Sequence, residues 1–183
     1  MRSRLLIVDR DGVINEDSPD FIKSPEEWVP IPGSLQALGL AHQHGFSIHV
    51  VTNQSGIARG LLGIGDLHRI HRRLRQESQT HGGYIDAFFF CPHGPRQGCL
   101  CRKPQPGMVL ASLARSGISA AHAVMIGDRT TDLEAARAAG VRPVLVRTGH
   151  GGATAASLTS HDGIAVYEDL ATAVRALCQQ EIS

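Results

Sequence analysis

Short apolar runs alternate with helical patterns along almost the whole chain. Five runs are typical of buried strands, at 4–9, 47–53, 84–91, 123–128 and 142–148, and 164–167 is a candidate sixth. Apolar residues recur at helical spacing over 34–45, 65–82, 107–117, 131–140 and 168–180. Strand–helix alternation of this kind places parallel strands side by side, with helices on both faces. The sequence therefore predicts an α/β fold, a Rossmann-like three-layer sandwich with a mainly parallel sheet.

The bulk composition limits the number of domains and the classes of partner. A chain of 183 residues, 42% of them hydrophobic, can bury one core, so we expect a single domain over residues 1–183. A formal net charge of +1 lacks the basic excess of nucleic-acid or membrane-surface binders. No apolar run approaches the roughly 20 residues of a membrane span. We expect a cytoplasmic monomer with no nucleic-acid or membrane partner.

Polar residues follow the expected strands. Asp9 and Asp11 come after the first strand, Thr52 ends the second, Lys103 lies beyond the third, and Asp128 ends the fourth. A single aspartate at such a place is most often a helix or turn cap. Ligands of open parallel sheets bind at the carboxyl ends of the strands, however, so these groups are expected to converge. Crowded carboxylates favour Mg²⁺, and the lysine and threonine could hold a phosphoryl group against it.

Three cysteines and a histidine lie within eleven positions. Cys91, His93, Cys99 and Cys101 form a C-x-H pair and a C-x-C pair with five residues between them. Four such ligands on one loop suit a tetrahedral, structural Zn²⁺ site, and a disulfide is disfavoured where thiols stay reduced. The zinc-binding loop at 91–101 would fix the position of Lys103, which follows it.

The order of these motifs resembles that of the haloacid dehalogenase superfamily of phosphatases. The matching motifs are DxDG, then Thr, then Lys, then GD-xxx-D, and they span nearly the whole chain. The resemblance implies Asp9 as nucleophile and Asp11 as general acid and then base. It implies Thr52 and Lys103 as phosphoryl contacts. Catalytic Mg²⁺ would be held by Asp9, Asp128 and the backbone carbonyl of Asp11. The fold implied is the haloacid dehalogenase fold without a large cap domain.

Three segments resemble one zinc-containing branch of that superfamily: LIVDRDGVIN (6–15), KSPEEW (23–28) and TNQSGIARG (52–60). The resemblance implies a Mg²⁺-dependent hydrolase of a phosphorylated sugar, a heptose bisphosphate, in the metabolism that supplies lipopolysaccharide. Histidinol phosphate is the alternative substrate. The roles of Arg59, Arg129 and Asp132 and the preferred anomer stay open. The implied substrate-binding residues are Asp17, Ser18, Pro19, Asp20, Thr52, Asn53, Gln54, Ser55, Arg102 and Lys103.

Other classes of function explain less of the sequence. A zinc-stapled interaction module accounts for the cysteines but leaves the polar strand ends as coincidences. The segment HRIHRRLR (68–75) could be a nucleic-acid patch, yet its charges are spread around the helix as on a solvated face. A polynucleotide 3′-phosphatase would share the DxDG chemistry, but the near-neutral net charge disfavours it.

Overall fold

The computed structural model describes residues 3–159 and 162–179, so predictions made for residues 1–2, 160–161 and 180–183 lie outside it. Within these residues, six strands form one sheet in the order β3-β2-β1-β4-β5-β6, and every neighbouring pair is parallel. The strands are β1 (Arg4–Val8), β2 (Phe46–Asn53), β3 (Ala87–Cys91), β4 (Ala123–Gly127), β5 (Arg142–Val146) and β6 (Ala165–Tyr167). The predicted α/β fold with a parallel sheet is confirmed.

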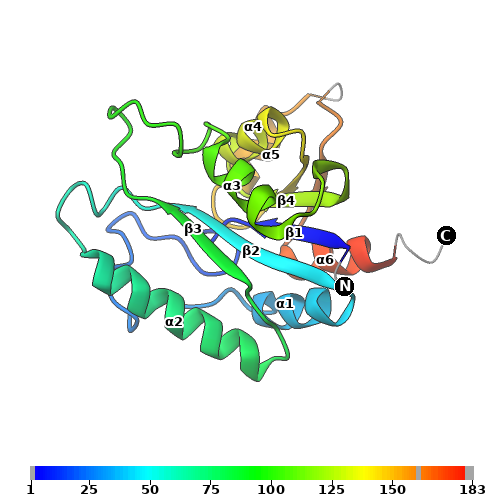
Figure 1. The fold of residues 1–183 in the computed structure, drawn as a ribbon, viewed down its shortest axis with the longest axis horizontal. Coiled ribbons are helices and arrows are strands. Elements are labelled where there is room, and N and C mark those ends of the chain that lie inside the picture. The colour runs from blue at the N-terminus through cyan, green and yellow to red at the C-terminus, as the bar shows by residue number, and fades with distance from the viewer. Residues whose placement is uncertain (1–2, 160–161, 180–183) are drawn as a thin grey trace.

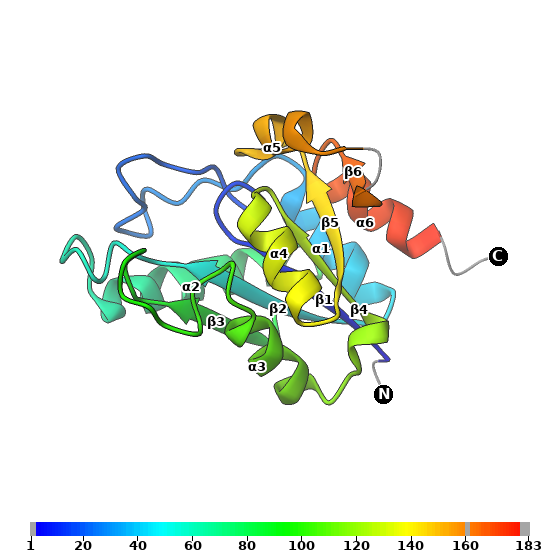
Figure 2. The same ribbon diagram turned by 90° about the horizontal axis from the view of Figure 1, so that it is seen from above.

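Helices cover both faces of the sheet (Figures 1 and 2). They are α1 (Ser34–Gln43), α2 (Ile64–Thr80), α3 (Gly107–Ser116), α4 (Thr130–Ala138), α5 (Gly151–Ser157) and α6 (Leu170–Gln179), with a 3₁₀ turn at Ala120–His122. Alternate residues of β1 face opposite sides: Leu6 and Val8 pack with α1, α2 and α6, whereas Leu5 and Ile7 pack with α3 and α4. The continuous apolar runs of the sequence follow from this, because both faces of a central strand are buried.

The strand order reverses beside β1, and this brings the polar strand ends together. The chain leaves β1 for β2 and β3 on one side and then crosses back to β4 on the other. Val8, the last residue of β1, is level with Val50 of β2 and Ile126 of β4. The residues that follow these three positions therefore emerge at one edge of the sheet, at the switch point where open α/β sheets bind ligands.

The structure differs from the sequence-based prediction at α5. The sequence predicts no helix between the strands at 142–148 and 164–167, and this stretch is rich in glycine, which disfavours helices. Within its described part, a helix begins at Gly151, where a Cβ atom would lie 1.6 Å from the carbonyl oxygen of Val146. Glycine is needed here for the close approach to β5, and its helix propensity is overridden.

The connections around the site are loops. Residues 9–33, between β1 and α1, and 54–63, between β2 and α2, contain no helix or strand. Neither of these two connections therefore holds a cap domain. Among the described helices, none combines the length and hydropathy needed to cross a membrane.

Candidate active site

Three buried carboxylates meet at the carboxyl edge of the sheet. Asp9 follows β1, Asp128 follows β4, and Asp132 lies in the first turn of α4. One oxygen of each lies within 4.8 Å of the others. The backbone N–H of Arg129 donates to Asp132 Oδ2 at 3.0 Å, so this aspartate also caps the helix. The structure thus brings Asp9 and Asp128 together as the sequence predicts, and it adds Asp132 to the group.

Lys103 is buried against these carboxylates. Its ammonium nitrogen lies 2.9 Å from Asp9 Oδ1 and 2.6 Å from Asp132 Oδ1, and it donates to the carbonyl oxygen of Val51 at 3.1 Å. Burial alone would lower the pKa of the lysine, but Asp132 and Asp9 outweigh burial and raise it. Lys103 is therefore a permanent cation at the centre of the site.

One ammonium does not balance three carboxylates. Burial, together with the neighbouring carboxylates, raises the pKa of Asp9 well above its ordinary value in spite of Lys103. Burial, and next the charge of Asp132, raise the pKa of Asp128 to about 6 against the hydrogen bond from His150. Raised pKa values of this origin mark a place where negative charge is in excess, and a bound cation would relieve it.

Asp128 is enclosed by two glycines and keeps one oxygen unused. A Cβ atom would lie 2.4 Å from Asp128 Oδ2 at Gly12 and 2.3 Å from it at Gly149, and both residues have positive φ. Asp128 Oδ2 accepts the backbone N–H of His150 at 2.7 Å. Asp128 Oδ1 is buried and has no hydrogen-bond partner among the described residues. Such an orphaned oxygen is available to a metal ion.

Asp11 faces a different set of groups. Arg10 donates to Asp11 Oδ1 from Nε at 3.0 Å and from Nη2 at 2.8 Å. Asn15 donates to the same oxygen at 3.0 Å, and Gln54 donates to Asp11 Oδ2 at 2.8 Å. Burial would raise the pKa of Asp11, but the Arg10 guanidinium and these hydrogen bonds outweigh burial and lower it. The two aspartates of the DxD motif therefore differ in their electrostatics.

The second strand contributes the side chains beside these groups. The amide nitrogen of Gln54 donates to Thr52 Oγ1 at 2.8 Å and so fixes the hydroxyl next to Asp11. Asn53 forms two reciprocal hydrogen bonds of 3.1 Å with the backbone of Lys103. These bonds join β2 to the segment after the cysteine cluster and hold the lysine in register.

A cavity of about 1280 Å³ opens above the carboxylates. Of the sequence-predicted substrate-binding residues, nine line it, and Asp20 does not: its side chain is exposed. At the rim, Asp17 Oδ2 accepts from Arg129 Nη2 at 2.8 Å and lies 3.1 Å from His150 Nε2. The loop after β1 is thereby tied to the segments after β4 and β5.

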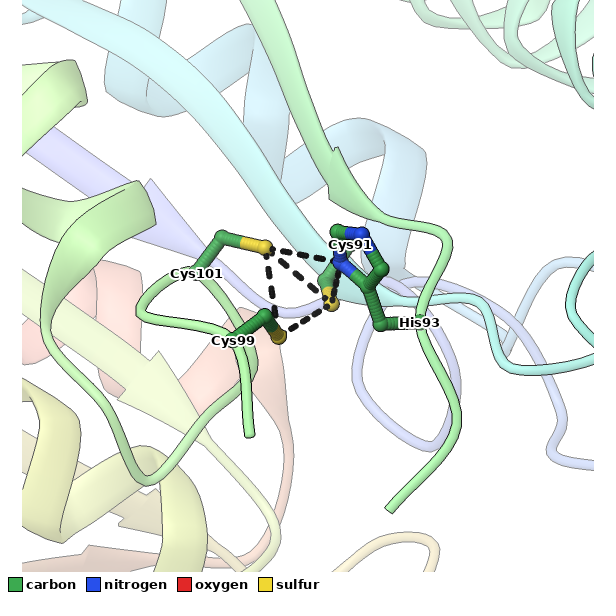
Figure 3. Close-up of side chains that lie close together, drawn as sticks. All are labelled: Cys91, His93, Cys99 and Cys101. Carbon is green, nitrogen blue, oxygen red and sulfur yellow. Dashed lines mark hydrogen bonds between the residues drawn. The ribbon is translucent and has the colours of Figure 1, made fainter. Parts of the chain in front are cut away.

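The four predicted zinc ligands form a compact cluster (Figure 3). The sulfur atoms of Cys91, Cys99 and Cys101 and Nδ1 of His93 are separated by 3.3–3.6 Å in each measured pair. Bonds of about 2.0–2.3 Å to a central Zn²⁺ give tetrahedral edges of roughly 3.5–3.8 Å. The donor atoms therefore lie within a few tenths of an ångström of the separations that a zinc tetrahedron requires.

Sequence reasoning missed several neighbours of the site. It assigned no role to Arg10 or Asn15, although both lie within the quoted DRDGVIN motif and both contact Asp11. It did not apply the strand-end rule to β5, after which Gly149 and His150 enclose Asp128. The glycine pair around His150 is the signal that could have indicated this close approach.

The chain is similar to proteins of one named activity. The model of the HAD-hydrolase-like family matches residues 100–173. A D-glycero-beta-D-manno-heptose-1,7-bisphosphate 7-phosphatase of Bordetella bronchiseptica is 45% identical over 97% of this chain and 99% of that protein. The one of Pseudomonas aeruginosa is 45% identical over 98% of this chain and 100% of that protein. The crystal structure of the D,D-heptose 1,7-bisphosphate phosphatase of B. bronchiseptica, complexed with magnesium and phosphate, has a TM-score of 0.92 at 45% identity, and covers 97% of this chain and 99% of that one.

Proposed function

The chain belongs to the D-glycero-beta-D-manno-heptose-1,7-bisphosphate 7-phosphatases within the HAD-like hydrolases, and on this premise we propose that it removes the 7-phosphate of D-glycero-β-D-manno-heptose 1,7-bisphosphate. The observation that carries the proposal is the meeting of Asp9, Asp128 and Lys103 at one strand edge, with Asp11 and Thr52 beside them. Phosphoryl transfer needs this combination of a nucleophile, fixed cations and a proton carrier.

Each catalytic residue has a role that its surroundings support. Asp9 attacks phosphorus and forms an aspartyl-phosphate, while Asp11 protonates the departing sugar oxygen. Asp11 then takes a proton from the water that hydrolyses the intermediate. Thr52 and Lys103 hold the phosphoryl oxygens. Hydrogen bonds fix both side chains before substrate arrives, so these contacts are preorganised.

Magnesium fits the carboxylate group. Asp9 and Asp128 would hold it together with the backbone carbonyl of Asp11, and the unpartnered Oδ1 of Asp128 is an oxygen left for this purpose. The ion would neutralise the excess negative charge of the site and of the phosphoryl group. A similar protein was crystallised with magnesium and phosphate, which supports the same choice here.

Zinc fits the cysteine cluster, and we assign it a structural role. The four donors Cys91, His93, Cys99 and Cys101 leave no open position for a water molecule. Burial raises the pKa of the Cys91 thiol to about 12, so this residue becomes a thiolate only when a cation replaces its proton. Arg102 donates to the carbonyl oxygen of His93 at 3.2 Å, and the loop thus supports the rim of the cavity.

The substrate pocket is formed by loops in place of a cap. Asp17, Ser18 and Pro19 form one wall and Ser55 another, while Arg102 lies at the zinc-loop side, where a second phosphate would find a cation. Asp20 does not line the cavity, so we propose that it contacts only a substrate that extends beyond the cavity. An open site of this size suits an extended sugar bisphosphate.

The wider setting follows from the same assignment. A heptose bisphosphate phosphatase would act in ADP-heptose and lipopolysaccharide core biosynthesis. We propose one catalytic domain over residues 1–183 that acts as a cytoplasmic monomer, without nucleic-acid or membrane partners.

Phosphate release tests the proposal. The wild-type chain, with Mg²⁺, is given both anomers of heptose 1,7-bisphosphate and histidinol phosphate at matched concentrations. We expect kcat/KM for the β-bisphosphate to exceed that for histidinol phosphate by about 100-fold, which corresponds to roughly 2.7 kcal/mol of transition-state stabilisation. The reverse preference overturns the substrate assignment. Asp9→Asn should abolish turnover without unfolding the chain, whereas an interaction module would be unaffected.

A further inference from the structure

Arg10 is a buried cation that the proposed reaction has not used. Its side chain is 1% exposed, and taking a guanidinium out of water costs several kcal/mol unless it is well paired. Its Nη1 atom has no hydrogen-bond partner among the described residues. An arginine kept at such a cost beside a reacting carboxylate indicates a function that apolar packing would not supply.

The hydrogen bonds of Asp11 are divided unequally between its two oxygens. Oδ1 accepts three N–H groups, from Arg10 Nε, Arg10 Nη2 and Asn15 Nδ2, at 2.8–3.0 Å. These three bonds fix the position of that oxygen. Oδ2 accepts Arg10 Nη2 at 2.9 Å and Gln54 at 2.8 Å, and lies 3.5 Å from the hydroxyl of Thr52. Oδ2 is thus the oxygen on the phosphoryl side.

We propose that Arg10, with Asn15 as its helper, is a positioning residue that holds Asp11 with Oδ2 turned toward the phosphoryl group and the departing sugar oxygen. The inference rests on the proposed function and deepens it. The guanidinium of Arg10 is buried and directed at Asp11, so its effect on the reaction passes through that carboxylate.

The proton follows a balanced path. In the first half-reaction an oxygen of Asp9 bonds to phosphorus, the bond from phosphorus to the sugar oxygen breaks, and the proton on Asp11 Oδ2 passes to that oxygen. In the second, water attacks the phosphorus, its proton passes to Asp11 Oδ2, and Asp9 leaves as a carboxylate with inorganic phosphate released. Arg10 and Asn15 keep the same oxygen in place for both transfers.

The effect of a variant on substrates with different leaving groups distinguishes a residue that positions the general acid from one that only supports the fold. A sugar alkoxide leaves only if it is protonated, whereas p-nitrophenolate leaves without a proton. A residue that acts through the general acid is therefore needed for the sugar phosphate and dispensable for p-nitrophenyl phosphate. A residue that merely supports the fold, or that binds phosphate, affects both substrates alike.

The experiment measures the first half-reaction in single turnover, with Mg²⁺-loaded enzyme in excess over heptose bisphosphate or p-nitrophenyl phosphate. Arg10→Met should slow release of the sugar by about 100-fold and of nitrophenolate by less than about fivefold. Arg10→Lys, which keeps the charge without the fork, should lie between wild type and Arg10→Met. Arg73→Met is the matched control, because Arg73 pairs with Glu77 on α2 and does not line the cavity.

A double-mutant cycle tests whether Arg10 acts through Asp11. In an Asp11→Asn background, Arg10→Met should lower the rate of sugar release by less than about a further threefold, because the carboxylate that Arg10 positions is gone. Equal losses on both substrates, or additive losses in the cycle, overturn the positioning role. Asn15→Leu should also slow release of the sugar more than release of nitrophenolate, but by a smaller factor. If Arg10→Met does not fold, this variant tests the positioning role in its place. Inactive wild-type enzyme on both substrates would instead refute the proposed function.

Discussion

The ammonium nitrogen of Lys103 lies 2.6 Å from a carboxylate oxygen of Asp132. The lysine that follows the cysteine cluster is thus anchored to the first turn of α4. Asp132 has two partners, since it also caps α4 through the backbone N–H of Arg129. This relationship favours an anchoring role for Asp132 over a role as a metal ligand.

Asp132→Asn should therefore lower kcat by about 10–100-fold, because Lys103 loses the partner that fixes it. The apparent dissociation constant for Mg²⁺ should change much less than in Asp128→Asn, which removes the orphaned oxygen itself. Mg²⁺ titrations of phosphate release give both quantities. Equal losses of Mg²⁺ affinity in the two variants would make Asp132 a ligand.

The sequence predicted the parts of the site that depend on topology. Asp9 and Asp128 follow β1 and β4, Thr52 lies near the end of β2, and Lys103 lies on the segment after β3. The rule that parallel strands end at one edge of the sheet is sufficient to predict that they converge. The four candidate zinc donors could be recognised from spacing alone, since they lie on one loop. Both predictions need no knowledge of side-chain conformation.

The parts that were missed depend on loop conformation. A charged residue such as Arg10 is expected at the surface. It is buried because the chain turns after Asp11, where Gly12 has a φ of 81° and the N–H of Ile14 donates to the Arg10 carbonyl. The helix at Gly151 exists because glycine permits contact with β5, which no local pattern reports. Tertiary contacts decide both features.

Chelation should remove a structural ion that stabilises the loop at 91–101. We expect one zinc per chain in the purified protein, and Cys99→Ser should lower zinc content and weaken activity through the displaced Lys103. Zinc analysis by mass spectrometry and thermal unfolding measure the two effects. Cys178→Ala is the matched control, because Cys178 lies on α6, away from the cluster. Full activity in zinc-free protein would contradict the positioning role of the ion.

Arg102 should determine preference for a second phosphate. Arg102→Met removes a charged donor at the rim, and a charge-assisted hydrogen bond contributes about 1.5–3 kcal/mol. KM for heptose bisphosphate should rise about 10–100-fold, while KM for p-nitrophenyl phosphate, which has one phosphate, should stay within about threefold. Arg96→Met, an exposed arginine of the same loop, should change neither. A parallel rise for both substrates would place Arg102 at the transferred phosphate.

His71 should make the free energy of unfolding depend on pH. Burial, and next the charge of Arg10, lower the pKa of this histidine from 6.5 to about 3, and its ring stacks on Phe88 at 4.4 Å. Below pH 6.5 the unfolded chain binds a proton at this position that the folded chain does not, so stability falls as the pH falls.

Between pH 6.5 and pH 5, the wild type should lose about 1.7 kcal/mol more than His71→Gln, because the slope rises from half to nearly all of 1.36 kcal/mol per pH unit over this range. Urea unfolding at several pH values gives this difference, and the other histidines cancel because both proteins carry them. A constant difference across this range would mean that His71 keeps an ordinary pKa, and that its ring is open to water in the folded chain.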